Sequence, residues 1–226
     1  LKWFSYWKDY CYNFLLSLGL TNENLRLRDH DKAALAFYSK ATTDIEYLFP
    51  FGWGELWGIA DRTDYDLSRH EKYSGENLQY LDPFTNEKFT PYCVEPAVGV
   101  DRICLACLCE SYDEEILEKD TRIVMHLNPV LAPYKVAILP LSKQLKEEAE
   151  ELLLAFVKEF STTYDETGSI GKRYRRQDSI GTPYCVTVDF DSKDNKTYTL
   201  RDRDTMEQVR MSKEEIIKFV KEKIRF

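Results

Sequence analysis

After the sequence LAPYKVA at residues 131–137, segments with strand-like and helix-like patterns alternate to the end of the chain. This alternation is the strongest constraint on the fold. Parallel strands need a helical crossover between them, so the pattern predicts a small α/β sandwich with a mixed, partly parallel sheet. The expected strands are 136–139, 183–190 and 196–201, and the expected helices are 142–160 and 212–224.

The residues before this boundary predict an α+β arrangement. An amphipathic stripe predicts a helix over 1–18, closed by Gly19. No capping residue precedes that stripe, which predicts that the chain is part of a longer polypeptide. The polar residues 61–90 read as turns. The other expected elements are a strand at 25–30, a helix at 31–40, two strands within 44–60, a strand at 89–94 and an apolar helix at 100–112.

Charge and hydropathy exclude some functions. The net charge of −8 argues against a nucleic-acid binder driven by charge alone, but it leaves open a specific RNA binder with locally clustered cations. No run of about 18 apolar residues is present, so no membrane span is expected. Lys2, Lys8 and Asp9 interrupt the first residues, which argues against a signal peptide. We therefore expect a soluble, cytoplasmic protein.

Two motifs carry groups suited to binding an amino acid and a nucleotide. In VEPAVGVDR at 94–102, Glu95 offers an anion for an ammonium group, and Pro96 stiffens the backbone beside it. Gly99 permits close approach of a ligand, and Arg102 supplies a fork suited to phosphate. In the second motif, GWGELWG at 52–58, Glu55 is suited to Mg²⁺ or to a polar edge of a nucleotide. Taken alone, Arg102 also fits a surface ion pair with Asp101 or Glu110, and Glu55 a solvated carboxylate.

Three stretches resemble the dimeric glycyl-tRNA synthetases, which are class II aminoacyl-tRNA synthetases. They are ATTDIEYLFPFGWGELWGIADR at 41–62, VEPAVGVDR at 94–102, which looks like motif 3 of the class, and the run from LAPYKVA through GSIGKRYRRQD (168–178) to RDRDTMEQ (201–208). The resemblance covers essentially the whole chain. It implies that residues 1–128 are the C-terminal part of an antiparallel-sheet catalytic domain, and that 129–226 are a mixed-sheet anticodon-binding domain.

The resemblance also implies roles for individual residues. Arg102 would meet the γ-phosphate of a bent ATP and, with Glu55, would be catalytic. Most members have Ser where this chain has Ala97, and loss of that hydroxyl removes a hydrogen bond worth about 0.5–1.5 kcal/mol. The implied ATP-binding residues are Glu55, Leu56, Gly99, Val100, Asp101 and Arg102, and the implied glycine-binding residues are Glu95, Pro96, Ala97, Val98 and Gly99.

The implied activity is glycine–tRNA ligation. Glycine and ATP, with Mg²⁺, would form glycyl-adenylate, and tRNA(Gly) would then accept the glycyl group in a homodimeric parent protein. Motifs 1 and 2 of the class are not found, so a polypeptide of this length alone is expected to be inactive. Two alternatives stay open: a non-catalytic tRNA-binding module, and an accessory subunit of a nucleic-acid polymerase with a synthetase-like fold.

Residues 168–181 form a local basic cluster of the kind that an RNA binder with an acidic net charge would need. By the resemblance the cluster lies in the anticodon-binding domain, and Tyr174 within it could stack on a base. The alternative is a solvated helix face with its arginines paired to carboxylates. The alternating charges of 201–204 predict an internal salt-bridge network instead. The candidate tRNA-binding residues are Lys172, Arg173, Arg175 and Arg176.

The cysteines and histidines do not predict a metal site. A Cys-x-x-Cys spacing lies in the apolar helical run near residue 107, but no second pair completes four ligands. Burial as small apolar side chains is the better explanation. His30, His70 and His126 are scattered and are expected to be structural or surface residues. The residues considered for zinc are Cys93, Cys104, Cys107 and Cys109.

Overall fold

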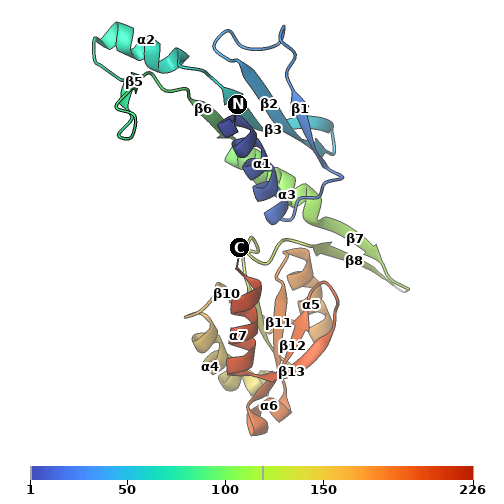
Figure 1. Cartoon of the computed structure of the whole chain (residues 1–226). Coiled ribbons are helices and arrows are strands. Elements are labelled where there is room, and N and C mark those ends of the chain that lie inside the picture. The colour runs from blue at the N-terminus through green and yellow to red at the C-terminus, as the bar shows by residue number, and fades with distance from the viewer. Residues whose placement is uncertain (1, 119, 226) are drawn as a thin grey trace. The chain divides into compact units, whose positions relative to one another are not determined.

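The computed structural model describes residues 2–118 and 120–225. The chain divides into two compact units, Leu1–Ala106 and Cys107–Phe226 (Figure 1). The fold combines antiparallel sheets with a mixed sheet, as the sequence predicted.

The first unit is built on a four-stranded antiparallel sheet in the order β1-β2-β3-β6. Helix α1 (Lys2–Ser17) lies against β3 and β6 (Figure 1). Residue 1, with which that helix was expected to begin, lies outside the described residues. The strands are β1 (Leu25–Asp29), β2 (Ala41–Phe49), β3 (Gly52–Asp61) and β6 (Val94–Val98), which confirms the strands expected at 25–30 and within 44–60.

The two faces of this sheet differ in polarity because side chains alternate along each strand. Phe14 of α1 contacts the Trp57 ring edge-on, with centroids 5.9 Å apart, so Trp57 marks the covered face. Its cross-strand partner Ile45 lies on the same face and is fully buried. The opposite face carries Asp44, Glu46, Glu55 and Glu95, which come from three adjacent strands.

Three expectations in this unit were wrong. Residues 61–90 are not turns throughout, because residues 65–74 form a helix. Residues 31–40 form turns, closed by hydrogen bonds such as Ala34 N to Asp31 O, and not a helix. A segment this short recovers little of the nucleation cost of a helix. The strand expected at 89–94 is split between the ends of two strands. The other elements are α2 (Tyr65–Ser74), β4 (Tyr80–Leu81), β5 (Lys88–Phe89) and α3 (Val100–Ser111), the last confirming the apolar helix.

The second unit holds a five-stranded sheet in the order β10-β9-β11-β12-β13. Strand β9 is parallel to both neighbours, and the pairs on the other side of β11 are antiparallel, which confirms the mixed sheet. The strands are β9 (Val136–Pro140), β10 (Thr162–Tyr164), β11 (Tyr184–Val188), β12 (Thr197–Asp202) and β13 (Gln208–Ser212).

Helices pack against both faces of this sheet. Val136 and Ile138 of β9 pack with Leu152 of α4 and Ile216 of α7 in the larger core. Their neighbour Leu139 faces the other way, toward Tyr174 of α5. The helices are α4 (Lys146–Phe156), α5 (Ile170–Ser179), α6 (Phe190–Asn195) and α7 (Lys213–Lys223), with a 3₁₀ turn at Lys143–Leu145.

A hairpin of β7 (Tyr112–Ile116) and β8 (Thr121–Met125) belongs to the second unit. Strand β8 packs on α5, and its Arg122 is fully buried there. For this reason the compact units divide at residue 106, within α3. The domain boundary that the resemblance places after residue 128 stays a prediction. Within the described ranges, every helix is too short or too polar to cross a bilayer.

A buried charge network joins this hairpin to α5 and β12. Asp178 is fully buried and accepts two hydrogen bonds from Arg201, at 2.8 and 3.1 Å. Arg122 Nε lies 3.7 Å from the same carboxylate, and its Nη2 donates to the carbonyl of Arg203 at 2.7 Å. Arg203 in turn donates to the carbonyl of Gly181. The internal network predicted from residues 201–204 is therefore confirmed for both arginines.

We predict that Asp178→Asn lowers the free energy of unfolding of the second unit by about 3–5 kcal/mol, because it leaves buried guanidinium groups without their counter-charge. Hydrogen exchange of β11 and β12, measured in the whole chain, reports this unit. The matched control, Asp191→Asn, alters an exposed carboxylate on α6 and should change exchange little. Equal protection in the two variants would contradict the assigned role of Asp178.

Candidate functional site

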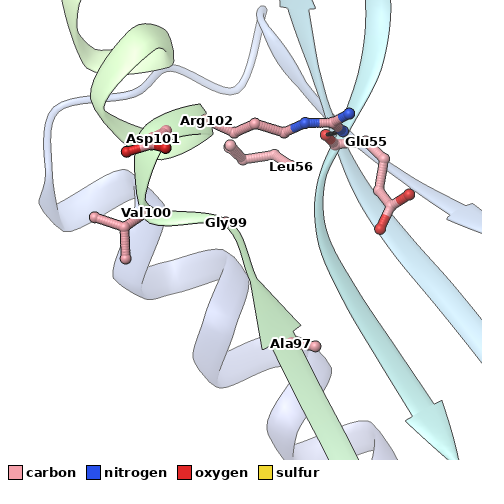
Figure 2. Close-up of a pocket in the computed structure, with 7 residues that line it drawn as sticks. All are labelled: Glu55, Leu56, Ala97, Gly99, Val100, Asp101 and Arg102. Atoms are coloured by element: carbon pink, nitrogen blue, oxygen red, sulfur yellow. Dashed lines mark hydrogen bonds between the residues drawn. The ribbon is translucent and has the colours of Figure 1, made fainter.

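A cleft of about 460 Å³ opens in the first unit where β3 passes the end of β6 and the start of α3 (Figure 2). The six residues that the sequence assigned to an ATP site all line it, although they come from segments more than 40 residues apart. The lining residues are Glu55, Leu56, Ala97, Gly99, Val100, Asp101 and Arg102.

A β-bulge in β3 sets the orientation of the first two. Ile45 pairs with Trp57 and Glu46 pairs with Glu55, so Leu56 has no partner of its own on β2. Such an extra residue bends the strand and redirects its side chains. Leu56 is buried, whereas the side chain of Glu55 is exposed.

Arg102 is tied across the cleft. Its Nη1 donates to the backbone carbonyl of Glu55, a contact between α3 and β3. Figure 2 shows its guanidinium at that carbonyl, with the Glu55 carboxylate turned away from it. Within residues 2–118 and 120–225, Arg102 makes no ion pair with Asp101 or Glu110, so the surface-pair alternative is not what the structure has. Its other N–H groups remain available for an anion.

Contacts within the protein do not explain why position 99 is a glycine. A Cβ built at this position would meet the side chain of Arg102 only at 3.8 Å, which is an ordinary contact. The space above Gly99 is part of the cleft. Close approach of a ligand therefore stays the explanation for glycine here.

A second pocket, of about 290 Å³, adjoins the cleft on the polar face of the sheet. The two pockets share Glu55 and Ala97. Gly58 lies beneath the shared wall, and a Cβ there would come within 3.3 Å of Glu55 Oε1. Gly58 thus leaves room for that carboxylate. The second pocket is lined by His30, Ala34, Ala36, Tyr38, Thr42, Asp44, Glu55, Gly58, Ala60, Glu95 and Ala97.

Most carboxylates on this face already have an arginine or histidine partner. Asp44 is 2.6 Å from His30 Nε2, and Glu95 is 2.5 Å from Arg62 Nη1. Burial opposes ionisation of Glu46, but hydrogen bonds from two arginines of β1 outweigh it and hold the pKa of Glu46 below its ordinary value. Among the described residues of the sheet's polar face, Glu55 is the carboxylate without an ion pair, so it has the most capacity to bind an added cation.

The residues assigned to glycine fall on two faces of β6. Glu95 and Ala97 line the second pocket. Pro96 pairs with Ile59 and Val98 pairs with Trp57, so their side chains point toward the face covered by α1. Pro96 and Val98 can therefore contribute to the site only through their backbone.

Sequence reasoning missed several residues around this pocket. Arg62 stacks on Tyr38, with its guanidinium carbon 4.1 Å from the ring centroid, and it pairs with Asp66. A detectable signal was the spacing of Arg62 and Asp66, four residues apart at the start of a helix. Asp44 and His30 were also missed, although alternation along β2 places Asp44 beside Glu46.

The basic cluster on α5 is largely engaged within the second unit. Arg173 is buried and donates to the carbonyls of Pro140, Glu166 and Gly168, so it supports the fold. Tyr174 bonds Thr187, and its ring lies under the guanidinium of Arg201, which leaves it poorly placed to stack on a base. The more exposed members are Lys172, Arg175, which pairs with Asp120 at 3.2 Å, and Arg176, which pairs with Asp165 at 2.6 Å.

One cluster was not anticipated from the scattered histidines. Asp113, Glu115 and His126 offer ligand atoms within 4.8 Å of one another. Arg122 lies 3.1 Å from Glu115, so a cation is already present beside these carboxylates. The signal in the sequence was two acids at i and i+2, which share one face of a strand.

Comparison with known proteins gives these sites a context. A family model described as the anticodon binding domain matches residues 135–223. The chain is 60% identical over its whole length to a glycine–tRNA ligase from Clostridium tetani, 61% identical to one from Clostridium acetobutylicum and 59% identical to one from Bacillus cereus. It covers 49% of each, so the chain spans about half the length of the curated relatives it matches.

A solved structure shares the fold. The crystal structure of the RNA binding domain of threonyl-tRNA synthetase from Cryptosporidium parvum superposes with a TM-score of 0.63 at 19% identity, covering 83% of this chain and 44% of that one. At this identity the likeness concerns the fold alone. Sequence identity near 60% along the entire chain shows common descent with the ligases. The chain is therefore similar to the glycine–tRNA ligases over the half of their length that it covers, and its residues 135–223 match the anticodon binding domain family.

Proposed function

We propose that this chain is the part of an ATP-dependent glycine–tRNA ligase that carries one wall of the ATP and glycine sites and the domain that reads tRNA(Gly). The observation that supports this most directly is the contact of Arg102 with the carbonyl of Glu55, 47 residues away, in a single cleft. In this proposal residues 1–128 belong to the catalytic domain of a cytoplasmic homodimer, and residues 129–226 are the anticodon-binding domain.

The larger cleft suits a nucleotide. Its volume falls within the range of about 300–1,000 Å³ that is usual for small-molecule sites. Arg102 would bind the γ-phosphate with the N–H groups that face the cleft. Mg²⁺ in such sites is held by one or two carboxylates together with substrate phosphates, and Glu55 has a carboxylate to offer. When bound, the ion would neutralise charge on the phosphates.

The smaller pocket suits glycine. Glu95 would accept a hydrogen bond from its ammonium group, and Glu55 lies on the wall between the two pockets. Ala97 offers no hydroxyl, so recognition of the ammonium depends on carboxylates alone at this wall. The position of Ala97 between the pockets would hold the amino acid next to the triphosphate.

The proposed chemistry requires positioning more than a protein nucleophile. A carboxylate oxygen of glycine attacks the α-phosphorus of ATP, a C–O–P linkage forms, and the bond to pyrophosphate breaks. A hydroxyl of the terminal ribose of tRNA(Gly) then attacks the glycyl carbonyl and releases AMP. Arg102 would stabilise charge on the departing pyrophosphate.

For tRNA we retain three of the four basic candidates. Arg173 is excluded because its guanidinium is buried against backbone carbonyls. Lys172, Arg175 and Arg176 are on the accessible side of α5, and the two arginines would exchange surface ion pairs for phosphates. Such surface pairs stabilise proteins by about 0–1 kcal/mol, so the exchange costs little.

We predict that Arg102→Ala lowers kcat/KM for ATP in glycine-dependent ATP–pyrophosphate exchange by about 10²-fold or more, because a charge-assisted contact to phosphate is lost. The assay uses the natural polypeptide that contains this chain. Arg69→Ala, which removes an exposed guanidinium from α2, is the matched control and should retain activity. Unchanged exchange in Arg102→Ala would refute the assignment of the cleft to ATP.

We predict that Lys172→Ala and Arg175→Ala each weaken binding of a tRNA(Gly) transcript, and that each reduces the slope of log K against log salt by about 0.7–0.9, as expected for one lost phosphate contact. Filter binding over a range of salt concentrations measures both quantities. Lys218→Ala on α7 removes an exposed cation elsewhere in the unit and serves as the control. An unchanged slope in both variants would show that this face of α5 does not contact RNA.

A further inference from the structure

Glu95 stands on a partly open face of the sheet and is restrained by one neighbour. Its side chain is 48% exposed, and its Oε2 accepts a hydrogen bond from Arg62 Nη1 at 2.5 Å. A carboxylate this exposed would otherwise rotate among several positions. The Arg62 contact selects one of them and leaves Oε1 to accept a hydrogen bond from a ligand.

Arg62 is itself fixed from two further directions. It forms a bidentate pair with Asp66, with Nε at 2.6 Å from Oδ2 and Nη2 at 3.0 Å from Oδ1. The ring of Tyr38 lies under its guanidinium, 4.1 Å away. The hydrogen bond to Asp66 contributes most to raising the pKa of Arg62, and the hydrogen bond to Glu95 adds to it. The hydrogen bond between Arg62 and Asp66 also lowers the pKa of Asp66.

The backbone brings the two partners together. Arg62 follows β3 directly, and its N–H donates to the carbonyl of Cys93 at 2.9 Å. The N–H of Cys93 donates back to Thr63 at 2.8 Å, which extends the pairing of β3 with β6 by one step. The distance between Arg62 and Glu95 is therefore set by the sheet and not by a flexible loop.

We propose that Arg62, held by Tyr38 and Asp66, is a positioning residue that fixes the Glu95 carboxylate and so sets the affinity of the smaller pocket for the ammonium group of the amino acid. This deepens the proposed function and rests on it. Arg62 faces two carboxylates, so its charge is already balanced and the pocket stays negative. Its main effect is orientation, and not a loss of attraction for the ammonium group.

Steady-state ATP–pyrophosphate exchange by the natural polypeptide that contains this chain separates glycine binding from catalysis. Holding one long side chain in one orientation contributes up to about 1.5 kcal/mol, so Arg62→Ala should raise KM for glycine by up to about tenfold. Both kcat and KM for ATP should stay within about twofold. Arg62→Lys keeps the charge but cannot bridge two carboxylates in a planar fork, so it should recover only part of the loss.

Two milder variants act on Arg62 without removing it. Asp66→Asn should raise KM for glycine by a smaller factor, about two- to fivefold, because Asp66 lines neither pocket and acts through Arg62. This test holds even where Arg62→Ala fails to fold. Tyr38→Leu should also raise KM for glycine, but it alters the pocket wall as well as the stack on Arg62. Arg69→Ala, on the same helix as Asp66, is the control. It should leave KM for glycine unchanged.

The outcomes are distinct. An active wild type in which Arg62→Lys, Asp66→Asn and Tyr38→Leu all leave KM for glycine unchanged would overturn the positioning role. A lower KM in these variants would also overturn it, because it would show that Arg62 acts by opposing the ammonium charge. Absence of glycine-dependent exchange in the wild type would instead refute the proposed function itself.

Discussion

Strand β3 is hydrogen-bonded along both edges, to β2 and to β6, and the two adjoining pockets beside Glu55 depend on that double pairing. The bulge opposite Ile45 leaves Leu56 extra and presents Glu55 between the pockets. The pairing with β6 sets Ala97 beside Gly58, and a Cβ at position 58 would come within 3.3 Å of Glu55 Oε1. Arg102 then closes the arrangement by bonding the carbonyl of Glu55. Backbone pairing thus determines where the charged groups stand.

In the second unit, buried ion pairs hold the β7–β8 hairpin and helix α5 against the sheet. Asp178 sits between Arg201 and Arg122, so each of three elements contributes one partner. Breaking such a group is costly because the remaining charges stay buried. The cations of α5 are engaged by other groups: Arg173 by backbone carbonyls, and Arg175 and Arg176 by surface carboxylates. Arg173 of α5 and Arg201 of β12 serve the fold, and only the outer residues of the helix are accessible to a ligand.

Many of the helices and strands were predictable from the sequence, because hydrophobic periodicity and Gly or Pro breakers are local features. The mixed sheet, the paired strands within 44–60 and the helix at 100–112 follow from such patterns. The grouping of residues 99–102 with Glu55 came from the family resemblance, and the structure has these residues lining one cleft. The turns at 31–40 were missed although the segment is too short to recover the nucleation cost of a helix. The stack of Arg62 on Tyr38 could not be predicted from spacing. Strand alternation could have shown that Pro96 and Val98 face α1. The partnership of Arg62 with Glu95 depends on a strand register across 33 residues, which sequence alone does not supply.

In the proposed function, the two adjoining pockets together bind one molecule, the glycyl-adenylate. Calorimetry with a non-hydrolysable glycyl-adenylate analogue, using the natural polypeptide that contains this chain, tests it most directly. We expect tight binding of the glycyl analogue, and binding at least tenfold weaker when its ammonium group is replaced by a methyl group, because Glu95 and Glu55 would then face no cation. Equal affinity for the two analogues would contradict the account.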